Sequence, residues 1–586
     1  RPPDGLRLVQ KTSTNTRRIA DRLHTPIAGQ ERRAALPGAA IAETKVLGSQ
    51  LIIRTLHRLG VKTIFSLSGN QIMPLYDACI DAGIRIIHVR HEAAAVFMAD
   101  AWAQITGELG VAMLTAAPGI TNGLAPLYSA SQAESPVLLI SGDSSVSEDG
   151  SGAFQELDQV AITSPLTKLS LRPLSAGELH PALHRLVAEA LAPRRGPVHL
   201  ALPFDLLTAE TGLSEIPDAD MPLAATEPDA RGLEQLAALV NAAQRPLVLT
   251  GPTGARPHMR AAREKLEAAL DLRVIPMESP RGLKDPSLGS LSALIPQADL
   301  IVLAGKCLDF TLGFGGAGAL GKHARVAVID PDPGMLARAG RLLGERLVLS
   351  LQAEPCAALS AIQAAPPAGR AAWRAQVDEA LRNRTSLGAP APGNGALGPR
   401  ALCETVQAFL AAAPEPILIC DGGEFGQWAQ AFCQAPARII NGMSGAIGAG
   451  VCYAIAAKIA RPEATVVVLM GDGTAGFHLM ELDTAVREHA AIIAVIGNDL
   501  RWNAEHLIQM RAYGPQRLIG CELSPTARYH EVAAALGGAG YAAHDAASLG
   551  TALGAAMNSG LPACINVSLA GEAAPVFSPS TQSATG

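Results

Sequence analysis

Residues 464–499 read ATVVVLMGDGTAGFHLMELDTAVREHAAIIAVIGND, and this stretch decides the fold class. A run of apolar, β-branched residues leads directly into a Gly-Asp-Gly turn at 471–473. A helical pattern follows at 477–488, and a second apolar run follows at 491–496. Two buried strands separated by a helix indicate a βαβ unit, whose strands run parallel in one sheet.

Each strand of this unit ends at an acidic residue, Asp472 after the first and Asp499 after the second. Because parallel strands place their carboxyl ends on the ligand-binding edge of an open sheet, we expect both carboxylates on one rim. Hard oxygen ligands suit Mg²⁺, which also takes phosphate oxygens and water. Gly471 and Gly473 let the backbone approach a phosphate closely. Gly-Asp-Gly alone also fits an ordinary turn, so the prediction of a metal and phosphate site depends on Asp499.

The same alternation of apolar runs and helical patterns recurs along the chain, and it is typical of parallel sheets covered by helices on both faces. We therefore predict an α/β protein with three doubly wound parallel-sheet domains, at 41–207, 233–365 and 400–570. The predicted strands are 61–67, 84–89, 109–115, 136–140, 197–202, 246–250, 273–276, 299–304, 325–330, 416–420, 464–470, 491–496 and 563–568.

Four segments lie outside these domains. Polar or Pro- and Gly-rich stretches at 208–232 and 366–399 are predicted linkers. The Arg-rich residues 1–40 and the small, polar residues 571–586 are predicted to be disordered. An Arg-rich leader also suits a targeting segment, but the acidic residues within it weaken that alternative.

Composition narrows the class of protein. The net charge of −6 argues against nucleic acid as a partner, because binding phosphates requires a basic face. The chain has no apolar run long enough for a transmembrane helix. Its nine cysteines are scattered and form no CxxC pair, which indicates reduced thiols. We expect a soluble, cytoplasmic protein that binds neither nucleic acid nor membranes.

The first domain carries a second group of polar residues. Glu92 begins a helix directly after the strand at 84–89, where the helix dipole alone would favour a carboxylate. Three further polar segments, at 68–71, 118–122 and 152–156, are expected on the same sheet edge. This grouping favours a ligand site over a simple helix cap.

Taken together, these segments resemble the acetolactate synthase-like family of thiamine diphosphate enzymes, from about residue 45 to 570. RHEAAAVFMADAWAQITGELGVAMLTAAPGITNGL at 90–124 resembles the family's pyrimidine-binding domain. GAFQELDQV at 152–160 resembles its glutamine-bearing loop, and 471–499 resembles its diphosphate motif. The resemblance implies a pyrimidine-binding domain, a central Rossmann-like domain and a diphosphate-binding domain, in that order.

The resemblance also implies an enzyme, a transferase or lyase that makes or breaks a carbon–carbon bond next to a carbonyl. It would use thiamine diphosphate and Mg²⁺ to decarboxylate a 2-oxo acid and ligate the product to an acceptor. Two alternatives stay open within the family, a 2-hydroxyacyl lyase and a simple 2-oxo acid decarboxylase. The substrate would be a 2-oxo acid or a 2-hydroxyacyl compound.

Individual roles follow from the family's motifs. Glu92 would hydrogen-bond the cofactor's pyrimidine ring and promote the tautomer that removes the thiazolium proton, and Gln155 would face the substrate carbonyl. His478 and His506 are candidate proton donors, with polar rim residues as the alternative. The metal would bind Asp472, Asp499 and the carbonyl of Arg501. The residues expected to contact the cofactor are Asn70, Gly119, Asn122, Gly422, Gly423, Glu424, Ile447, Gly471, Asp472, Gly473 and Thr474.

Two of these expectations concern shape and assembly. Ile447 would bend the cofactor into a V, although an ordinary core isoleucine is the alternative from sequence alone. Because Glu92 would act on a cofactor held by another subunit, the active site should lie between chains of a homodimer or homotetramer.

The chain departs from the family pattern at several positions. The metal motif ends Asn498-Asp499 instead of Asn-Asn, which keeps an oxygen ligand. Ile508 stands where synthases carry a substrate-selecting tryptophan, and we expect Ile508 and Glu505 to shape the acceptor pocket. Residues 307–311 read CLDFT where synthases carry Arg-Phe-Asp-Asp-Arg, so bound FAD is disfavoured.

Two alternative functions lie outside this chemistry. Residues 313–318 form a GxGxxG pattern that would suit a nicotinamide or flavin oxidoreductase, but they do not directly follow the strand at 299–304. A non-catalytic relative would be expected to lack Glu92 or a metal carboxylate, and this chain keeps them.

Overall fold

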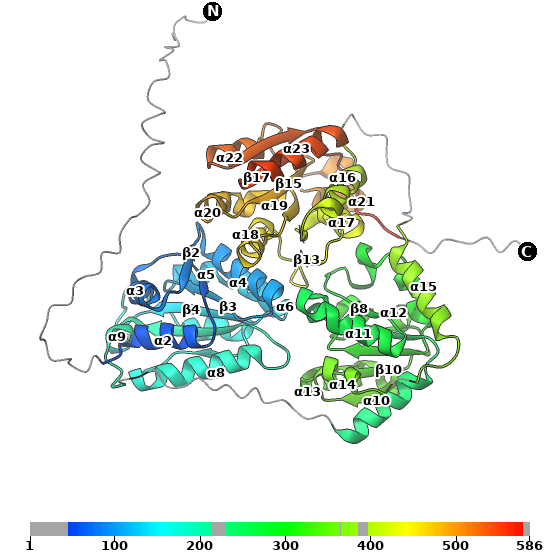
Figure 1. The fold of residues 1–586 in the computed structure, drawn as a ribbon, viewed down its shortest axis with the longest axis horizontal. Coiled ribbons are helices and arrows are strands. Elements are labelled where there is room, and N and C mark those ends of the chain that lie inside the picture. The colour runs from blue at the N-terminus through cyan, green and yellow to red at the C-terminus, as the bar shows by residue number, and fades with distance from the viewer. Residues whose placement is uncertain (1–44, 214, 216–228, 364, 385–395, 578–586) are drawn as a thin grey trace, which may run out of the picture. The chain divides into compact units, whose positions relative to one another are not determined.

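Three parallel β-sheets with helices on both faces organise the chain, which confirms the predicted fold class (Figure 1). The computed structural model describes residues 45–213, 215, 229–363, 365–384 and 396–577. The predicted leader at 1–40 lies outside those ranges. No helix within them is both long and apolar enough to cross a membrane.

The first sheet has the strand order β2-β1-β3-β4-β6-β5. Helices α2, α3 and α8 bury their apolar side chains against one face, and α4 and α6 against the other. The strands are β1 (Thr63–Ser66), β2 (Arg85–His88), β3 (Gly110–Leu114), β4 (Val137–Asp143), β5 (Ser170–Leu171) and β6 (Val198–Pro203). The helices are α2 (Gly48–Arg58), α3 (Met73–Ala82), α4 (Glu92–Thr106), α5 (Pro118–Asn122), α6 (Leu124–Gln132), α7 (Gln159–Thr163), α8 (Leu179–Leu191) and α9 (Phe204–Thr208).

The central sheet has the order β11-β10-β9-β7-β8. Its strands are β7 (Pro246–Thr250), β8 (Val274–Pro276), β9 (Leu300–Ala304), β10 (Val326–Ile329) and β11 (Leu347–Leu351). Its helices are α10 (Ala230–Ala242), α11 (Arg260–Leu270), α12 (Ala317–Leu320), α13 (Pro333–Leu343), α14 (Pro355–Ser360) and α15 (Arg370–Arg382).

The third sheet has the order β13-β12-β14-β15-β17-β16, so the two strands of the deciding βαβ unit are neighbours. Its strands are β12 (Ile417–Cys420), β13 (Ala437–Ile440), β14 (Val466–Gly471), β15 (Ile492–Asn498), β16 (Ala539–Ala543) and β17 (Ala563–Ser568). Its helices are α16 (Pro399–Ala412), α17 (Gly423–Phe432), α18 (Gly450–Ala460), α19 (Asp472–His478), α20 (Leu482–Arg487), α21 (Asn503–Tyr513), α22 (Tyr529–Ala535) and α23 (Ala546–Ser559).

Every strand that the sequence pattern missed lies at the edge of a sheet. These strands are β5, β11, β13 and β16. An edge strand has one paired side and is less buried, so its apolar signal is weaker; β16, for example, reads AGYAA and has one buried residue. The helix predicted at 477–488 also begins earlier, because α19 starts at Asp472 itself.

The segment predicted as a linker at 366–399 contains helix α15, and this prediction is wrong for its first half. Trp373 and Val377 are buried in the central core, and the Trp373 indole donates a hydrogen bond to the Pro246 carbonyl at 2.9 Å. Arg370 is fully buried and donates to backbone carbonyls, including that of Leu270 at 2.9 Å. The Pro- and Gly-rich composition around α15 obscured a short amphipathic helix.

The predicted tail at 571–586 is described up to residue 577, and this part packs against the third domain. The ring of Phe577 lies 6.3 Å from that of Phe432, edge to face. A side chain at Gly571 would stand 3.4 Å from the Asp499 carboxylate. The chain after β17 therefore returns to the carboxyl edge of the third sheet.

A shared core joins the first and third domains. Helices α4 and α18 pack against each other, and both are rich in alanine, which allows their backbones to approach closely. The buried residues Phe97 of α4 and Ile455 of α18 belong to one hydrophobic cluster. The Tyr453 hydroxyl donates to the buried Asp100 carboxylate at 2.8 Å across this contact. The position of α4 is thus set by the third domain as well as by its own sheet.

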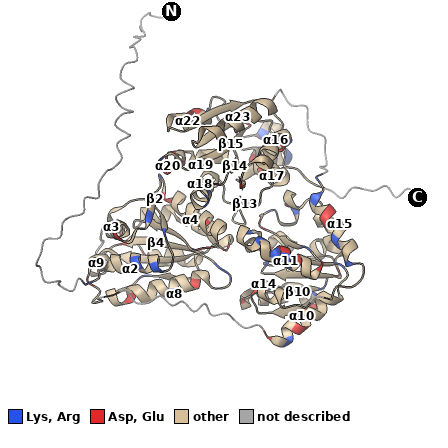
Figure 2. Ribbon diagram, in the orientation of Figure 1, with Lys and Arg blue, Asp and Glu red and all other residues tan. Residues whose placement is uncertain are grey.

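An ion pair joins the central and third domains. Arg438 of β13 donates to the Glu278 carboxylate at 2.7 Å, and the Glu278 side chain is 7% exposed. Figure 2 shows that most other charged groups lie along the outer helices, with both signs interspersed. Exposed pairs of that kind, such as Arg260–Glu264 on α11, contribute little to stability.

We expect Arg438→Met to lower the free energy of unfolding by about 1–3 kcal/mol, because Glu278 would be left buried without its partner. Thermal unfolding would measure the effect, with Arg260→Met as the matched control that should change stability by less than about 0.5 kcal/mol. The double variant with Glu278→Gln should recover part of the loss. If Arg438→Met were as stable as the control Arg260→Met, this stabilising role of the Arg438–Glu278 pair would be contradicted.

Candidate active site

A cavity of about 350 Å³ lies at the carboxyl edge of the third sheet. Two larger cavities, of about 650 and 610 Å³, border the central domain. In the cavity of about 650 Å³, the acidic side chains of Glu267 and Asp378 already form ion pairs with Arg273. The smaller cavity contains most of the residues predicted to hold a diphosphate and a metal. They are Gly422, Gly423, Glu424, Ile447, Gly471, Asp472, Gly473, Thr474, Asp499 and Arg501.

Two carboxylates that follow neighbouring strands line this cavity. Gly471 at the end of β14 pairs with Gly497 of β15, and Asp472 and Asp499 follow close behind. Burial, together with the negative charge of Asp472, raises the pKa of Asp499 to about 7. One oxygen of Asp472, Oδ2, is buried without a hydrogen-bond partner. The sequence prediction that the two acids share one rim is therefore met, and a divalent cation would relieve their repulsion.

The backbone of Arg501 borders this pair. Leu500 accepts a hydrogen bond from Leu523 at 2.8 Å, and Trp502 donates one to Cys521 at 2.7 Å. In an antiparallel pair, a residue that lies between two hydrogen-bonded neighbours points its own N–H and C=O groups away from the partner strand. The N–H and C=O of Arg501 therefore point away from the 521–523 segment, and its N–H faces the Asp472 carboxylate. The predicted carbonyl ligand is placed on the side of the two aspartates.

The donor set fits Mg²⁺ bound together with a phosphate. The described residues contain no group of three or more His, Cys, Asp or Glu side chains placed to hold a metal. Two carboxylates and one carbonyl leave the remaining positions of an octahedron to phosphate oxygens and water. This arrangement suits a metal that bridges the protein and a diphosphate.

A buried aspartate fixes the glycine-rich wall of the cavity. The Asp421 carboxylate accepts the N–H groups of Gly422 at 2.6 Å and of Gly448 and Gly450 at 2.9 Å. It thereby ties the loop before α18 to the end of β12. A side chain at Gly422 would stand 2.4 Å from Ile447 Cγ2. Ile447 thus forms part of the cavity wall and is not the ordinary core isoleucine that the sequence left open.

An aromatic ring covers the Gly-Asp-Gly turn. A Cβ atom at Gly473 would stand 2.6 Å from the Trp502 ring, so no larger residue fits there. Trp502 also lines the cavity, as does Glu505 of α21. Ile508, which we expected to shape an acceptor pocket with Glu505, is 54% exposed and does not line this cavity. Its predicted role is not supported by its position in the single chain.

The residues predicted to bind the pyrimidine ring form a separate group on the first sheet. Glu92 is the first residue of α4, and its Oε2 accepts a hydrogen bond from Asn122 Nδ2 at 2.9 Å. Asn122 ends α5, which also contains Gly119, and Asn70 begins a 3-10 turn after β1. Among the described residues that line the 350 Å³ cavity, none belongs to 45–213.

Gln155 lies in a loop that is held in a strained backbone conformation. Its φ is +61°, and its Oε1 accepts a hydrogen bond from Gln71 Nε2 at 2.8 Å. Gln71 in turn accepts the Thr115 hydroxyl at 2.7 Å. Strain at a polar residue on a ligand-binding edge is typical of a functional position.

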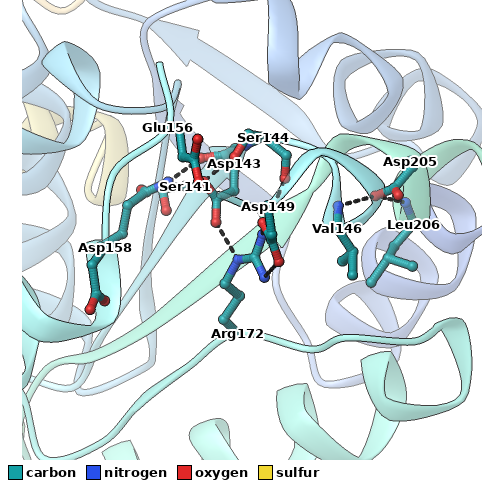
Figure 3. Close-up of polar contacts among 12 residues, drawn as sticks. Ser141, Asp143, Ser144, Val146, Asp149, Glu156, Asp158, Arg172, Asp205 and Leu206 are labelled. Carbon is teal, nitrogen blue, oxygen red and sulfur yellow. Dashed lines mark hydrogen bonds and ion pairs between the residues drawn. The ribbon is translucent and has the colours of Figure 1, made fainter. Parts of the chain in front are cut away.

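Arg172 holds this loop in place, as Figure 3 shows. Its Nε donates to Asp143 at 2.6 Å, and its terminal nitrogens bond both oxygens of Asp149, at 2.7 and 3.0 Å. Glu156 accepts backbone N–H groups of the same loop, including that of Gly150 at 2.6 Å. The Phe154 side chain between these anchors is 76% exposed.

The two candidate histidines lie beside the cavity and do not line it. His478 is buried, and burial lowers its pKa, so its imidazole is neutral at pH 7. Its Nδ1 lies 2.9 Å from the Gly448 carbonyl, and its ring lies 5.9 Å from that of His91. His506 Nε2 lies 3.3 Å from the Arg501 guanidinium. Their role as proton donors stays a prediction.

Sequence reasoning missed Glu481, which holds the start of α4. Its Oε1 accepts the backbone N–H groups of Arg90 and His91, both at 3.0 Å, and its Oε2 accepts the Thr484 hydroxyl at 2.6 Å. These bonds connect the third domain to the residues just before Glu92. Nothing in the helical pattern at 477–488 distinguishes a buried glutamate from an exposed one, so no sequence signal pointed to it.

Comparisons with known proteins identify the family of the chain. Models of the thiamine pyrophosphate enzyme N-terminal and C-terminal TPP binding domains match residues 47–162 and 421–567. A probable acetolactate synthase of Mycobacterium bovis is 32% identical over 546 residues, covering 90% of this chain and 96% of the relative. A 2-hydroxyacyl-CoA lyase 2 of Danio rerio is 30% identical, covering 84% of this chain and 86% of the relative.

A solved structure shares the fold. The Rhodococcus jostii RHA1 thiamine diphosphate-dependent 4-hydroxybenzoylformate decarboxylase superposes with a TM-score of 0.74 at 22% identity, covering 89% of this chain and 99% of that one. The two matched domains and the relatives define a thiamine diphosphate-dependent enzyme. The chain belongs to the acetolactate synthase-like family of thiamine pyrophosphate enzymes.

We expect Glu481→Ala to speed amide hydrogen exchange at Arg90 and His91 by about tenfold or more, because two backbone donors lose a buried acceptor. Exchange followed by mass spectrometry would measure it. Glu481→Gln keeps an acceptor oxygen and should change exchange less, and Glu531→Gln on α22, whose exposed carboxylate pairs with Arg528, serves as the control. Unaltered exchange in the alanine variant would show that Glu481 does not hold this junction.

Proposed function

We propose that the protein decarboxylates a 2-oxo acid and joins the product to an acceptor, using thiamine diphosphate and Mg²⁺. The observation that carries the proposal is the pair of carboxylates, buried Asp472 and half-buried Asp499, in a glycine-walled cavity. In this proposal Asp472, Asp499 and the Arg501 carbonyl hold Mg²⁺, and Gly423, where a Cβ atom would meet nothing within 4 Å, leaves room for the diphosphate. Bound thiamine diphosphate supplies an electron sink for the carbon next to the carbonyl.

The first domain would supply the proton chemistry. We propose that Glu92 exchanges a proton with the pyrimidine ring and that Asn122, which donates to its Oε2, keeps its carboxylate oriented. Proton transfer by a positioned group of this kind contributes about 10²–10⁴-fold in rate. Gln155 would donate to the substrate carbonyl from its anchored loop, and His478 or His506 would serve as a proton donor.

We further propose that the active site forms between two chains of a homodimer or homotetramer. Supporting this, the described lining of the 350 Å³ cavity contains no residue of the first domain, while Glu92 and Asn122 lie on that domain's own edge. Glu92 of one chain would then complete the cavity of another.

The nine unpaired cysteines suit a reducing compartment, and we place the enzyme in the cytoplasm.

A second candidate is a lyase acting on 2-hydroxyacyl thioesters. It is favoured by the 30% identity to the zebrafish 2-hydroxyacyl-CoA lyase 2 and by residues 307–311, which lack the arginines of the synthase pattern. Both candidates use the same carboxylate pair and the same proton chemistry. A screen of 2-oxo acids and 2-hydroxyacyl thioesters for carbon dioxide or aldehyde release would distinguish them.

We propose that the central domain holds no FAD. Asp330, at the end of β10, is the acid that a bound dinucleotide would be expected to use. Its carboxylate is already paired with Arg194 of the first domain, at 2.9 and 3.0 Å, and Arg194 also donates to the Gly305 carbonyl at 3.0 Å. The GxGxxG pattern at 313–318 spans a short 3-10 segment and the start of α12, away from the end of β9.

Asp472→Ala should abolish Mg²⁺-dependent binding of thiamine diphosphate, because a metal ligand beside the diphosphate is lost. Isothermal titration with the cofactor, in the presence and absence of Mg²⁺, would measure this. Asp483→Ala, which removes a carboxylate outside the cavity, should bind like the wild type. Wild-type affinity in Asp472→Ala would remove the basis of the proposal.

Mixing Glu92→Gln chains with Asp472→Ala chains should restore activity that neither variant has alone. Each mixed dimer would contain one site with both residues intact, so random pairing predicts roughly a quarter of wild-type activity. Steady-state rates before and after subunit exchange would measure the recovery. No recovery despite demonstrated exchange would place Glu92 and Asp472 in the same chain's site.

A further inference from the structure

One turn of the central domain reaches the cavity of the third domain. The chain after β8 places Ser279, Pro280 and Arg281 in the cavity wall. Glu278, the residue before this turn, is held by its ion pair with Arg438 of β13. The turn is therefore anchored to the same sheet that carries Asp472 and Asp499.

The backbone of the turn is fixed by its own hydrogen bonds. Gly282 donates to the Ser279 carbonyl at 3.1 Å, and the Arg281 N–H donates to the Ser279 hydroxyl at 3.2 Å. Gly282 has a φ of +54°, and a side chain there would stand 2.1 Å from the Thr311 carbonyl oxygen. The Cα atom of Arg281 is thus held at the edge of the cavity, while its side chain is exposed.

The guanidinium of Arg281 has no hydrogen bond or ion pair with any described residue, although acidic side chains share the cavity wall. It therefore lies beyond ion-pair distance of Asp472 and Asp499, the two proposed metal ligands, which line the same cavity. The other cation of the wall, Arg501, is engaged through its Nε with the Asp499 carbonyl at 3.2 Å and through Nη1 with His506. A planar guanidinium without a partner is suited to bind an oxyanion through two parallel hydrogen bonds.

We propose that Arg281 binds an oxyanion of the substrate and so contributes to substrate specificity. The oxyanion would be the carboxylate of a 2-oxo acid or a phosphate of an acyl-coenzyme A thioester, in line with the two candidate activities. The inference rests on the proposed function, because it assigns the rest of the same cavity to the cofactor and metal. It places the specificity of the reaction partly on the central domain.

The test uses calorimetry on the full chain loaded with thiamine diphosphate and Mg²⁺. The probes are oxamate, an unreactive analogue of a 2-oxo acid that keeps the carboxylate, and coenzyme A. Arg281→Gln should weaken binding of one probe by about 10–100-fold, the loss typical of a charged hydrogen bond. The affinity of Arg281→Lys should fall between those of the wild type and Arg281→Gln, because lysine keeps the positive charge but cannot form two parallel hydrogen bonds. Lys284→Gln, which removes a charge from the same turn outside the cavity, should bind like the wild type.

Each outcome has a distinct meaning. A loss with oxamate alone assigns the carboxylate, and a loss with coenzyme A alone assigns the phosphate; either supports the proposal. Unchanged affinities in Arg281→Gln, or a wild-type protein that binds neither probe, would overturn it. Weaker binding of thiamine diphosphate itself in this variant would also overturn it, because Arg281 would then hold the cofactor. Failure of the proposed function would appear separately, as absent Mg²⁺-dependent cofactor binding in the wild type.

Discussion

The repulsion between one buried and one half-buried carboxylate is the constraint around which the rest of the site is arranged. Asp472 and Asp499 follow neighbouring parallel strands, so the sheet itself brings them together. Partial burial of Asp499, and then the negative charge of Asp472, raise the pKa of Asp499 to about 7. The glycines, the Asp421 network and Trp502 shape a cavity beside this pair, large enough for phosphate groups. A divalent cation between the two carboxylates would convert this repulsion into attraction for a diphosphate.

The second constraint is the packing of α4 on α18. This contact and the Glu481 carboxylate fix the start of α4, and with it the position of Glu92, through the chain's own third domain. The same chain's cavity contains no described residue of the first domain. In the proposed function, one chain thus carries two separate half-sites, one for the metal and diphosphate and one for proton transfer. Pairing two chains would combine each half with its complement.

The sequence predicted those features that depend on local pattern. The three sheets, the two aspartates on one rim and the start of the helix at Glu92 follow from periodicity and strand ends. Features set by tertiary contacts escaped prediction, namely the edge strands, helix α15, Glu481 and the reach of Arg281 into the cavity. A glutamate or arginine in a polar helix or turn has no local signal that another domain will bury or use it. The roles of His478 and His506 as proton donors stay predictions.

The central claim is that Asp472, Asp499 and the Arg501 carbonyl share one divalent cation. A crystal structure of the protein with thiamine diphosphate and Mn²⁺ in place of Mg²⁺ tests it most directly, because anomalous scattering locates the manganese ion. The account predicts a peak bonded to one oxygen from each of the three residues, at about 2.0–2.2 Å. A cofactor bound in the cavity with no peak between the two carboxylates would contradict it.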